Sequence, residues 1–390
     1  MLFLGIDIAS KKHDCCIIGE NSELLAPVFS FENNASGFEF LLMEIRAHCK
    51  DFSAVKIGLE ATGHYSNNLI SFLQDKGFCL TVFNPLQVNL YRKAQTLRKT
   101  KTDKADARFL AQMLITSEQA AYAPQSLEIT ELKALVRHRF RLVSMRTRLK
   151  VSVSRLVAIL FPELPEVVSS IHQVSSYALL LEYPTAKSIS ECHLTRLTNL
   201  LHKSSGKRYD RNKALEIKNL AVKSIGTNSN AVGFELQQTI RLIGGLRDEI
   251  KLLDSRIEKL MIKIDSPILT IPGISYTLGS IIIAEIGDIS NFQTSAKLLA
   301  FAGLEPSTHQ SGNFRATDTP MVKRGSSYLR WALLQAARLV VLNDETFKQY
   351  AAKKEKEGKH YFVVMSHVGK KLVRVIFHLL KSNTSFLAQA

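Results

Sequence analysis

Residues 2–8 read Leu-Phe-Leu-Gly-Ile-Asp-Ile, an apolar run broken by a single carboxylate, Asp7. A second apolar run, Val55-Lys-Ile-Gly-Leu-Glu, ends at Glu60. Both runs are typical of buried strands, and a buried strand rarely carries a carboxylate without a use for it, because burying an unpaired charge is costly. We therefore predict that both acids are functional, with Glu60 at the carboxyl end of its strand, where α/β folds place their active groups.

The other segments of this region alternate between predicted strands and helices. Residues 1–20 are expected to form a β-hairpin with its turn at 10–14, residues 38–50 and 64–76 to form helices, and residues 79–83 to form another strand. Gly77 suits the C-cap of the second helix. This alternation indicates an α/β layer fold.

Two further acids, Asp103 and Asp106, lie at the predicted start of a helix. Their spacing of three residues places both on one side of that helix. Together with Asp7 and Glu60 they suggest a site for Mg²⁺, with Mn²⁺ as the alternative, because such ions are usually held by carboxylates and substrate phosphate. Two metals clamping a phosphate are the common solution for cutting nucleic acid. Taken singly, each acid could instead cap a turn, lie on the surface or favour the first turn of a helix.

Basic residues surround the helical acid pair. They are candidates for binding the phosphates of the strand that is cut, or they balance charge on a surface helix. These residues are Lys99, Lys101, Lys104 and Arg108.

The chain of 390 residues carries a formal net charge of +16 and a pI near 9.6. Such a surplus most often means a polyanionic partner, although it can serve solubility alone. The hydrophobic content of 46% is ample for packed cores and argues against general disorder. The length predicts two or three domains.

The cysteines and the apolar segments bear on the compartment. The five cysteines lack metal-ligand spacing and are predicted to be reduced thiols of a cytoplasmic protein. Asp7 and Lys11 come too early for the apolar region of a signal peptide. The uncharged stretch 266–284 raises the membrane question, but its Pro and Gly residues favour a soluble helix–turn–helix, so no membrane partner is expected.

Two heptad runs predict coiled-coil helices. The first spans about 127–160 and the second 236–264, and the two are expected to pack antiparallel, within a subunit or across a dimer. The segment 165–230 between them is weakly patterned and mixed helical. The repeating residues are Leu135, Leu142, Leu149 and Leu156 in the first run, and Leu236, Ile243, Ile250, Ile257 and Ile264 in the second.

The first coiled-coil helix is strongly basic. Residues 133–155 hold eight Lys or Arg and no Asp or Glu. This one-sided charge predicts that the outer face of the helix meets nucleic-acid phosphates, the alternative being a solvated basic face. The candidate residues are Arg137, Arg139, Arg141, Arg146, Arg148, Lys150 and Arg155.

The C-terminal part is predicted to be helical and to contain a candidate nucleophile. Ile271-Pro-Gly-Ile between apolar runs resembles a helix-hairpin-helix, whose turn can hold a DNA phosphate, although a plain helical hairpin fits as well. Ser311 precedes Gly312 in a loop, where a hydroxyl activated by cations could attack a phosphodiester, although a loop Ser-Gly is more often simply a turn. The candidate cations are Arg315, Lys323, Arg324 and Arg330.

Taken together, these segments resemble the DEDD-type insertion-sequence transposases of the IS110 group. The resemblance covers nearly the whole chain and depends on the order and spacing of its segments. One departure is Gly325-Ser326, where the family often has Gly-Asn. The segments are Gly5-Ile-Asp-Ile-Ala, Gly58-Leu-Glu-Ala-Thr-Gly, Lys101-Thr-Asp-Lys-Ala-Asp-Ala, Ile271-Pro-Gly-Ile, Phe301-Ala-Gly-Leu-Glu-Pro, Gln310-Ser-Gly and Lys323-Arg-Gly-Ser-Ser-Tyr-Leu-Arg.

The resemblance implies a RuvC-like nuclease domain of the RNase H type, with Asp7, Glu60, Asp103 and Asp106 as its DEDD tetrad binding Mg²⁺. It implies that Ser311 is a nucleophile that bonds covalently to DNA during strand exchange. It also implies a bridge RNA that pairs with donor and target DNA, so that base pairing selects the sequence.

We therefore expect a multidomain α/β and α protein. A RuvC-like domain is predicted at 1–125, coiled-coil helices at 126–265 with an insert at 165–230, and a helical C-terminal transposase domain with a helix-hairpin-helix-like motif at 266–390. The expected function is that of a transposase or site-specific DNA recombinase acting as a dimer or tetramer. The alternatives are a structure-selective endonuclease of the Holliday-junction resolvase type and an inactive nucleic-acid-binding relic.

Overall fold

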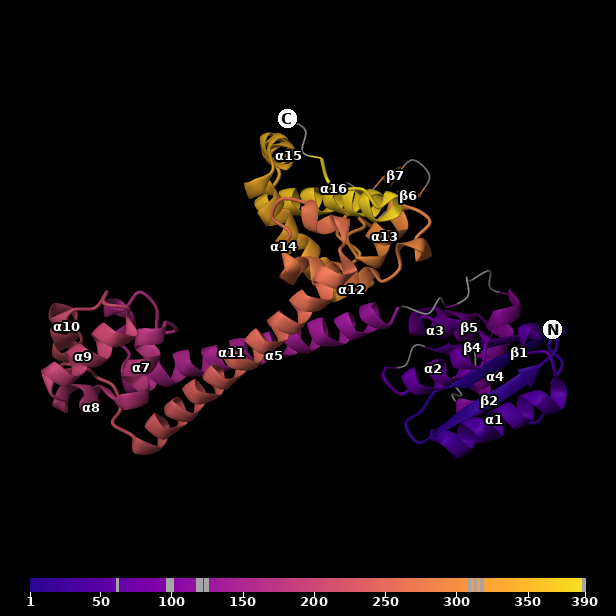
Figure 1. Ribbon diagram of the computed structural model, residues 1–390, viewed down its shortest axis with the longest axis horizontal. Helices are drawn as coiled ribbons and strands as arrows, with labels where there is room; N and C mark the ends of the chain where they lie inside the picture. The colour runs from indigo at the N-terminus through magenta and orange to yellow at the C-terminus, as the bar shows by residue number, and fades with distance from the viewer. Residues whose placement is uncertain are drawn as a thin grey trace. The chain divides into compact units, whose positions relative to one another are not determined.

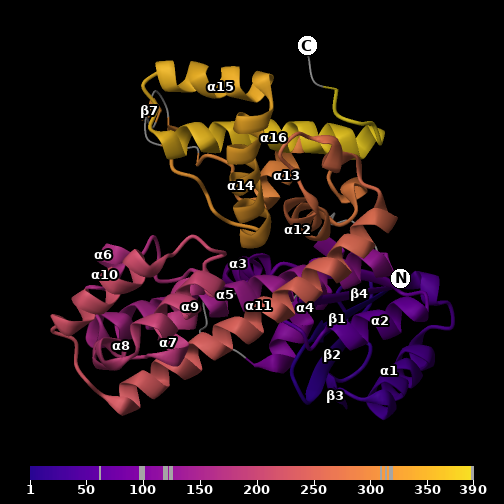
Figure 2. The same ribbon diagram turned by 60° about the vertical axis from the view of Figure 1, so that its left-hand side comes forward.

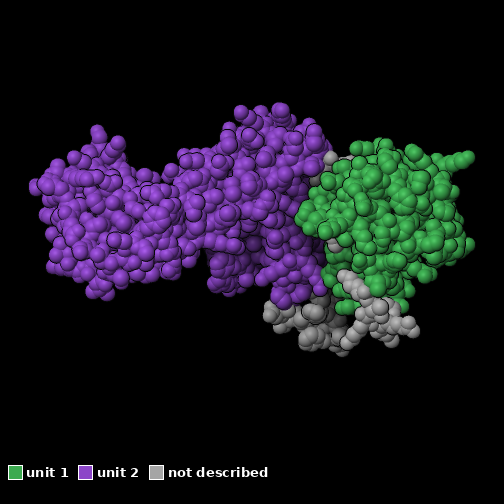
Figure 3. All heavy atoms as spheres, turned by 90° about the horizontal axis from the view of Figure 1, so that it is seen from below, with its two compact units in different colours: residues 1–124 green, residues 125–390 purple. Residues whose placement is uncertain are grey.

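The computed structural model describes residues 1–60, 63–95, 102–116, 122, 126–307, 310–311, 314–315 and 319–387, with the backbone alone at 310, 311, 314 and 315. The chain divides into two compact units, residues 1–124 and 125–390 (Figure 3). The predicted coiled-coil and C-terminal segments therefore belong to one unit. None of the described helices combines the length and apolarity that a membrane crossing requires.

Unit 1 contains a five-stranded mixed sheet with the strand order β3-β2-β1-β4-β5 (Figure 1). Strands β1, β4 and β5 run parallel, whereas β2 is antiparallel to both of its neighbours. The predicted α/β class is thereby confirmed. The strands are β1 (Leu2–Asp7), β2 (Lys12–Ile18), β3 (Phe29–Glu32), β4 (Val55–Glu60) and β5 (Cys79–Phe83).

Helices cover both faces of this sheet, which explains why its inner strands are apolar almost throughout. Side chains alternate along each strand, so Leu4 and Ile57 face a core shared with α1 (Ala35–His48) and α2 (Asn67–Asp75). Phe3 and Phe83 face the opposite core. Helices α3 (Pro85–Gln95) and α4 (Asp103–Thr116) cover that second face.

The structure corrects two details of unit 1. The predicted turn at 10–14 is too long, because β2 already begins at Lys12. Helix α3 was not predicted, because Asn84-Pro85 was interpreted only as the end of the preceding strand. Pro85 instead occupies the first helical position, which suits its fixed φ, and the Asn84 side chain accepts a hydrogen bond from the Leu86 N–H at 2.9 Å.

Unit 2 is built on two long helices, α5 (Leu127–Leu160) and α11 (Asn230–Ile264), which lie side by side (Figure 2). Ion pairs Arg139–Asp254 and Arg155–Glu235 show that they run antiparallel within one chain. The predicted continuous heptad seam is wrong in the middle of α5. No residue of α5 between 136 and 153 is fully buried.

Two separate hydrophobic cores form toward opposite ends of this helix pair. The first includes Leu156 and Leu236 and is completed by helices from the weakly patterned segment, α6 (Leu164–Val167), α7 (Val174–Glu182), α8 (Ala186–Glu191), α9 (Leu194–Ser204) and α10 (Arg211–Val222). The second includes Leu132 and Ile257 and is completed by the C-terminal helices α12 (Tyr276–Ile286), α13 (Ser295–Phe301), α14 (Ser327–Asn343), α15 (Glu345–Lys356) and α16 (Tyr361–Ser382).

Candidate functional site

Asp7 and Glu60 lie at the same edge of the sheet in unit 1. Asp7 is the last residue of β1 and Glu60 the last residue of β4. The two strands are parallel neighbours in which Ile6 is paired with Leu59, so the same register places the two acids next to each other. Because side chains alternate along a strand, both carboxylates belong to the face that α4 covers.

Two glycines allow α4 to approach the sheet closely. Gly5 and Gly58 are paired across β1 and β4 on the α4 face. A Cβ at Gly5 would lie 2.0 Å from the backbone oxygen of Ala107, and a Cβ at Gly58 would lie 2.9 Å from Leu114 Cγ. Helix α4 therefore rests on the strand backbone itself. Each glycine precedes a site acid by two residues, so this contact also fixes the distance between α4 and the strand ends that carry Asp7 and Glu60.

The first turn of α4 brings two more carboxylates to this edge. Asp103 and Asp106 both occupy that turn, where the helix dipole favours negative charge. Asp106 is only 7% exposed, and Arg92 Nη1 of α3 lies 3.5 Å from its Oδ1. Asp103 is exposed. The buried acid is thus oriented by a cation, whereas the exposed acid remains accessible to solvent.

The four predicted acids act on one another electrostatically. The pKa of Asp7 is raised from 3.8 to about 7, first by burial and then by the negative charges of Asp106, Asp103, Glu60 and Asp14. A carboxyl group in this position holds a proton near neutral pH unless a cation compensates for its neighbours. The structure thereby brings the predicted tetrad together around Asp7.

Asp14 is a fifth acid that sequence reasoning missed. It lies opposite Asp7 in the β1–β2 ladder, is 3% exposed, and accepts a hydrogen bond from Ser30 Oγ at 2.6 Å. The overlong predicted turn concealed it, because a turn residue is expected to face solvent. A shorter predicted turn would have put Asp14 in the second strand, and the pairing of the two strands would then have placed it opposite Asp7.

Asp7 and the acids around it offer carboxylate oxygens, which are the ligands that a hard divalent cation such as Mg²⁺ prefers. No group of three or more His, Cys, Asp or Glu side chains that could hold a metal ion occurs within the described ranges. The acids are therefore gathered at one edge but are not arranged as a coordination shell. Of the basic residues predicted around them, Lys104 and Arg108 are exposed on α4, while Lys99 and Lys101 lie outside the described residues.

Ser311 lies between α13 and α14, in the segment that was predicted as a loop, and forms part of a short pair of strands. Strand β6 (Gln310–Ser311) pairs with β7 (Phe314–Arg315), with Ser311 opposite Phe314. Pro306 and Met321 form a further, isolated β-bridge. The side chains of Ser311 and Arg315 lie outside the described part of the structure.

The base of this hairpin is closely packed. Gly325 has φ +100°, and a Cβ there would lie 2.0 Å from Phe301 O, while a Cβ at Gly303, with φ +67°, would lie 2.3 Å from Arg324 O. Arg330 Nη1 of α14 donates to Lys323 O at 3.0 Å. Arg330, predicted to bind DNA, is thus engaged with the backbone at the base. Lys323 and Arg324 are exposed.

An ion pair between a buried carboxylate and a partly exposed arginine joins this region to α5. Glu285 of α12 is 2% exposed and receives hydrogen bonds from Arg137 Nε at 2.7 Å, Arg137 Nη2 at 3.0 Å and Ser326 Oγ at 2.7 Å. Burial alone would raise the pKa of Glu285, but these hydrogen bonds hold it below its usual range. Ser326 also caps α14 by accepting from the Leu329 N–H at 3.1 Å. Serine is among the preferred N-cap residues, so Ser326 suits this position.

The Pro-Gly turn before α12 is packed against the protein. Ile271 and Ile274 on either side of it are 1% and 5% exposed, and a Cβ at Gly273 would lie 2.8 Å from the backbone of Leu339. The helical element that precedes it is the four-residue 3-10 helix Pro267–Thr270. These contacts favour the plain helical hairpin over a phosphate-binding turn.

The basic residues of α5 fall into two groups. Arg137, Arg139 and Arg155 form ion pairs with Glu285, Asp254 and Glu235, from α12 and α11. The structure records no ion pair within the described residues for the rest of the predicted set. The second group consists of Arg141, Arg146, Arg148 and Lys150.

Comparisons with known proteins identify families and relatives that this chain resembles. A family model of DEDD transposases, described as "Transposase", matches residues 4–162, and the model "Transposase IS116/IS110/IS902 family" matches residues 265–352. A "Pilin gene-inverting protein" of Moraxella bovis is 26% identical over 98% of this chain and 97% of its own length. "Insertion element IS116 uncharacterized 44.8 kDa protein" of Streptomyces clavuligerus is 23% identical over 99% and 96%, respectively. "Transposase for insertion sequence element IS1111A" of Coxiella burnetii is 23% identical over 87% and 77%.

Proposed function

Because the chain belongs to the IS110 family of transposases, we propose that it cuts and rejoins DNA strands with a carboxylate-bound Mg²⁺ site and a serine nucleophile. The observation that carries this proposal is the crowding of Asp7 by Glu60, Asp103 and Asp106 at one sheet edge, in the DEDD order of the family. A structural role alone would not explain four carboxylates placed where each disfavours the ionisation of Asp7.

Asp7, Glu60, Asp103 and Asp106 would hold the divalent ion, with Mn²⁺ as a substitute for Mg²⁺. When bound, the ion stabilises negative charge on the scissile phosphate and activates the attacking group. Arg92 orients the Asp106 carboxylate. The exposed side chains of Lys104 and Arg108 bind the neighbouring phosphates of the DNA strand.

Ser311 supplies the covalent step. Its Oγ attacks the phosphorus of a phosphodiester, and the bond from that phosphorus to one sugar oxygen breaks. The serine proton ends on the departing sugar oxygen, which leaves as a hydroxyl. A sugar hydroxyl of the partner strand then attacks the same phosphorus and forms the new phosphodiester. The bond from phosphorus to Ser311 Oγ breaks, and the proton of the attacking hydroxyl ends on that oxygen. Bonds are exchanged one for one, so the step requires no external energy source. Arg315, Lys323 and Arg324 stabilise the charge that develops on the phosphate.

The test is amplification across the joined element ends in cells that carry the gene with its native flanks. We expect a circular junction with the wild type and none with Asp7→Asn or Ser311→Ala. Asp75→Asn and Ser385→Ala, which change exposed residues outside both sites, are the matched controls and should retain the junction. A junction that persists in Ser311→Ala would remove the serine from the mechanism and favour the structure-selective endonuclease.

A bridge RNA is proposed as the source of sequence choice. The net charge of +16 and the unpaired cations of α5 suit a nucleic-acid backbone, which is bound without reading bases. A discrete RNA should co-purify with the protein, and its removal should abolish recombination until RNA transcribed from the native flanks is added. Full activity of an RNA-free preparation would contradict guidance by RNA.

Recombination between two duplexes requires at least two active sites, so we propose a dimer or tetramer. Light scattering of the complex with RNA and both DNA partners should give at least twice the mass of one protein chain with its nucleic acid. A single chain in an active complex would contradict this assembly.

A second candidate outcome of the same chemistry is DNA inversion. It is favoured by the full-length similarity to the Moraxella proteins named "Pilin gene-inverting protein". A plasmid with two inverted recombination sites distinguishes the two outcomes, because inversion reverses the intervening segment, whereas transposition releases a circle or inserts the element elsewhere.

A further inference from the structure

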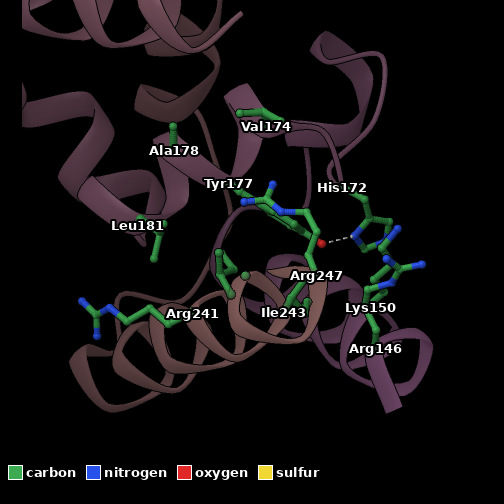
Figure 4. A pocket seen from close by; sticks show the side chains of 12 residues that line it. Arg146, Lys150, His172, Val174, Tyr177, Ala178, Leu181, Arg241, Ile243 and Arg247 are labelled. Carbon is green, nitrogen blue, oxygen red and sulfur yellow. Dashed lines mark hydrogen bonds between the residues drawn. The ribbon is translucent and has the colours of Figure 1, made fainter. Parts of the chain in front are cut away.

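A pocket of about 330 Å³ lies in unit 2 where α5, α7 and α11 meet (Figure 4). Its volume falls in the range of about 300–1,000 Å³ that is usual for small-ligand sites. Ala178 and Leu181 of α7 and Ile240 and Ile243 of α11 supply an apolar lining. The pocket lies outside the two predicted catalytic regions.

Four cations surround this apolar lining. Arg146 and Lys150 come from α5, Arg241 and Arg247 come from α11, and no acid lines the pocket. Among the described residues, the one ion pair of Arg247 is with the neighbouring exposed Asp248, at 3.6 Å. The structure records no ion pair for the other three among its described residues, and the buried Nε of Arg146 has no hydrogen-bond partner there. An anion is the ligand that such a group of donors binds best.

An aromatic pair is fixed beside the cations. His172 Nδ1 lies 3.0 Å from the Tyr177 hydroxyl (Figure 4), and His172 Nε2 lies 3.2 Å from Ser154 Oγ. The two rings meet edge to face, with centroids 6.1 Å apart. Burial, and then the charge of Lys150, lowers the pKa of His172, so the ring is neutral at pH 7. The pocket thus combines an aromatic surface, an apolar surface and a group of cations.

Gly244 lines the pocket at a position with room for a side chain. It lies within α11, where glycine is less favourable than alanine, and a Cβ at this position would meet no heavy atom within 4 Å. Gly245 is equally unobstructed but does not line the pocket. The two adjacent glycines therefore provide one position where a side chain enters the pocket and one where it does not.

We propose that this pocket holds one unpaired nucleotide of a bound nucleic acid, with its base against Tyr177 and the apolar lining and the phosphates of its strand bound by the cations around the pocket. A base inside a duplex is stacked and paired, and it can enter a pocket only after it leaves the stack. The inference rests on the proposed function for the presence of nucleic acid, but it is independent of the catalytic chemistry.

The test uses the purified full-length protein and three fluorescent probes of about 20 nucleotides, a single-stranded oligouridine, a single-stranded oligothymidine and a paired DNA duplex. Their dissociation constants are measured by fluorescence anisotropy at fixed salt. Gly244→Leu should weaken binding of a single strand by roughly tenfold, the loss expected for one stacked base, and should change duplex binding less than twofold. Gly245→Leu should change neither. If Gly244→Leu weakens the binding of oligouridine alone, the pocket takes ribonucleotides. If it weakens the binding of both single strands equally, the pocket takes an unpaired nucleotide with either sugar.

A second pair of variants tests the charge. Arg241→Gln removes a pocket cation, whereas Arg256→Gln removes an exposed cation elsewhere on α11. We expect Arg241→Gln to weaken single-strand binding more than Arg256→Gln does. Unchanged single-strand binding in Gly244→Leu, or an equal loss on single strands and duplex, would overturn the proposal. Because no strand cleavage is measured, failure of the catalytic proposal would leave this result unaffected.

Discussion

Asp7→Asn should stabilise unit 1 when divalent ions are removed by a chelator. The rise in the pKa of Asp7 from 3.8 to about 7 corresponds to about 4 kcal/mol against its ionised form in the folded state. Because Asp7 is only partly buried, screening by solvent reduces this figure to about 2 kcal/mol. Asparagine removes the charge at nearly constant volume, so the variant should gain about that much in its free energy of unfolding at pH 8.

The gain must depend on pH in one direction. The folded pKa lies above the unfolded value, so the contribution of Asp7 is most favourable below pH 3.8 and is lost as the pH rises to about 7. The advantage of Asp7→Asn should therefore be about 2 kcal/mol at pH 8 and less than about 1 kcal/mol at pH 5. Mg²⁺ should reverse the order by stabilising the wild type more strongly.

The assay must report on unit 1 alone. The single tryptophan, Trp331, lies in unit 2 and serves as an internal control, because its unfolding transition should not change. Hydrogen exchange of the slowest amides in β1 and β4, measured by mass spectrometry, gives the opening free energy of unit 1. Asp75→Asn is the matched surface control. If Asp7→Asn is less stable than the wild type at pH 8 in chelator, the crowding argument is refuted.

Three further substitutions test other contacts. Arg137→Ala leaves the buried carboxylate of Glu285 without its ion partner and should cost unit 2 about 3 kcal/mol in urea unfolding followed by Trp331 fluorescence, and a loss below about 1 kcal/mol would show that this ion pair is not important. Gly5→Ala forces α4 away from β1 and should cost unit 1 about 3 kcal/mol by hydrogen exchange, so unchanged stability would contradict the close contact. Gly244→Ala adds a Cβ in open space and should raise the stability of α11 by about 1 kcal/mol in thermal unfolding followed by circular dichroism, whereas destabilisation would mean that the space is filled.

The acid edge was predictable because its signals are local. An acid within an apolar strand is unusual in itself, and both Asp7 and Glu60 carry that signal together with a glycine two residues earlier. The role of those glycines was not predictable, because it depends on Ala107 and Leu114 of a helix that arrives later in the chain. Sequence spacing shows which residues share a face but not which element will cover it.

The charge prediction for α5 was incomplete for the same reason. Its arginines look alike in sequence, but Arg137, Arg139 and Arg155 have acidic partners 148, 115 and 80 residues away. Distant partners leave no periodic signal. The segment 165–230 was equally hard to interpret, because helices as short as α8, with six residues, bury too few positions to establish a period.

The antiparallel course of α5 and α11 makes the segment between them an insertion in a helical hairpin. Thr227 N donates to Ile159 O at 2.8 Å, and a Cβ at Gly226 would lie 2.2 Å from Leu160 O, so the chain returns to the point where it left α5. The entropy of closing such a loop changes only slowly with its length. Evolution can therefore lengthen, shorten or exchange these helices without moving the hairpin that carries the C-terminal core. A protein engineer has the same freedom, and this junction is the natural place in unit 2 to graft a foreign domain.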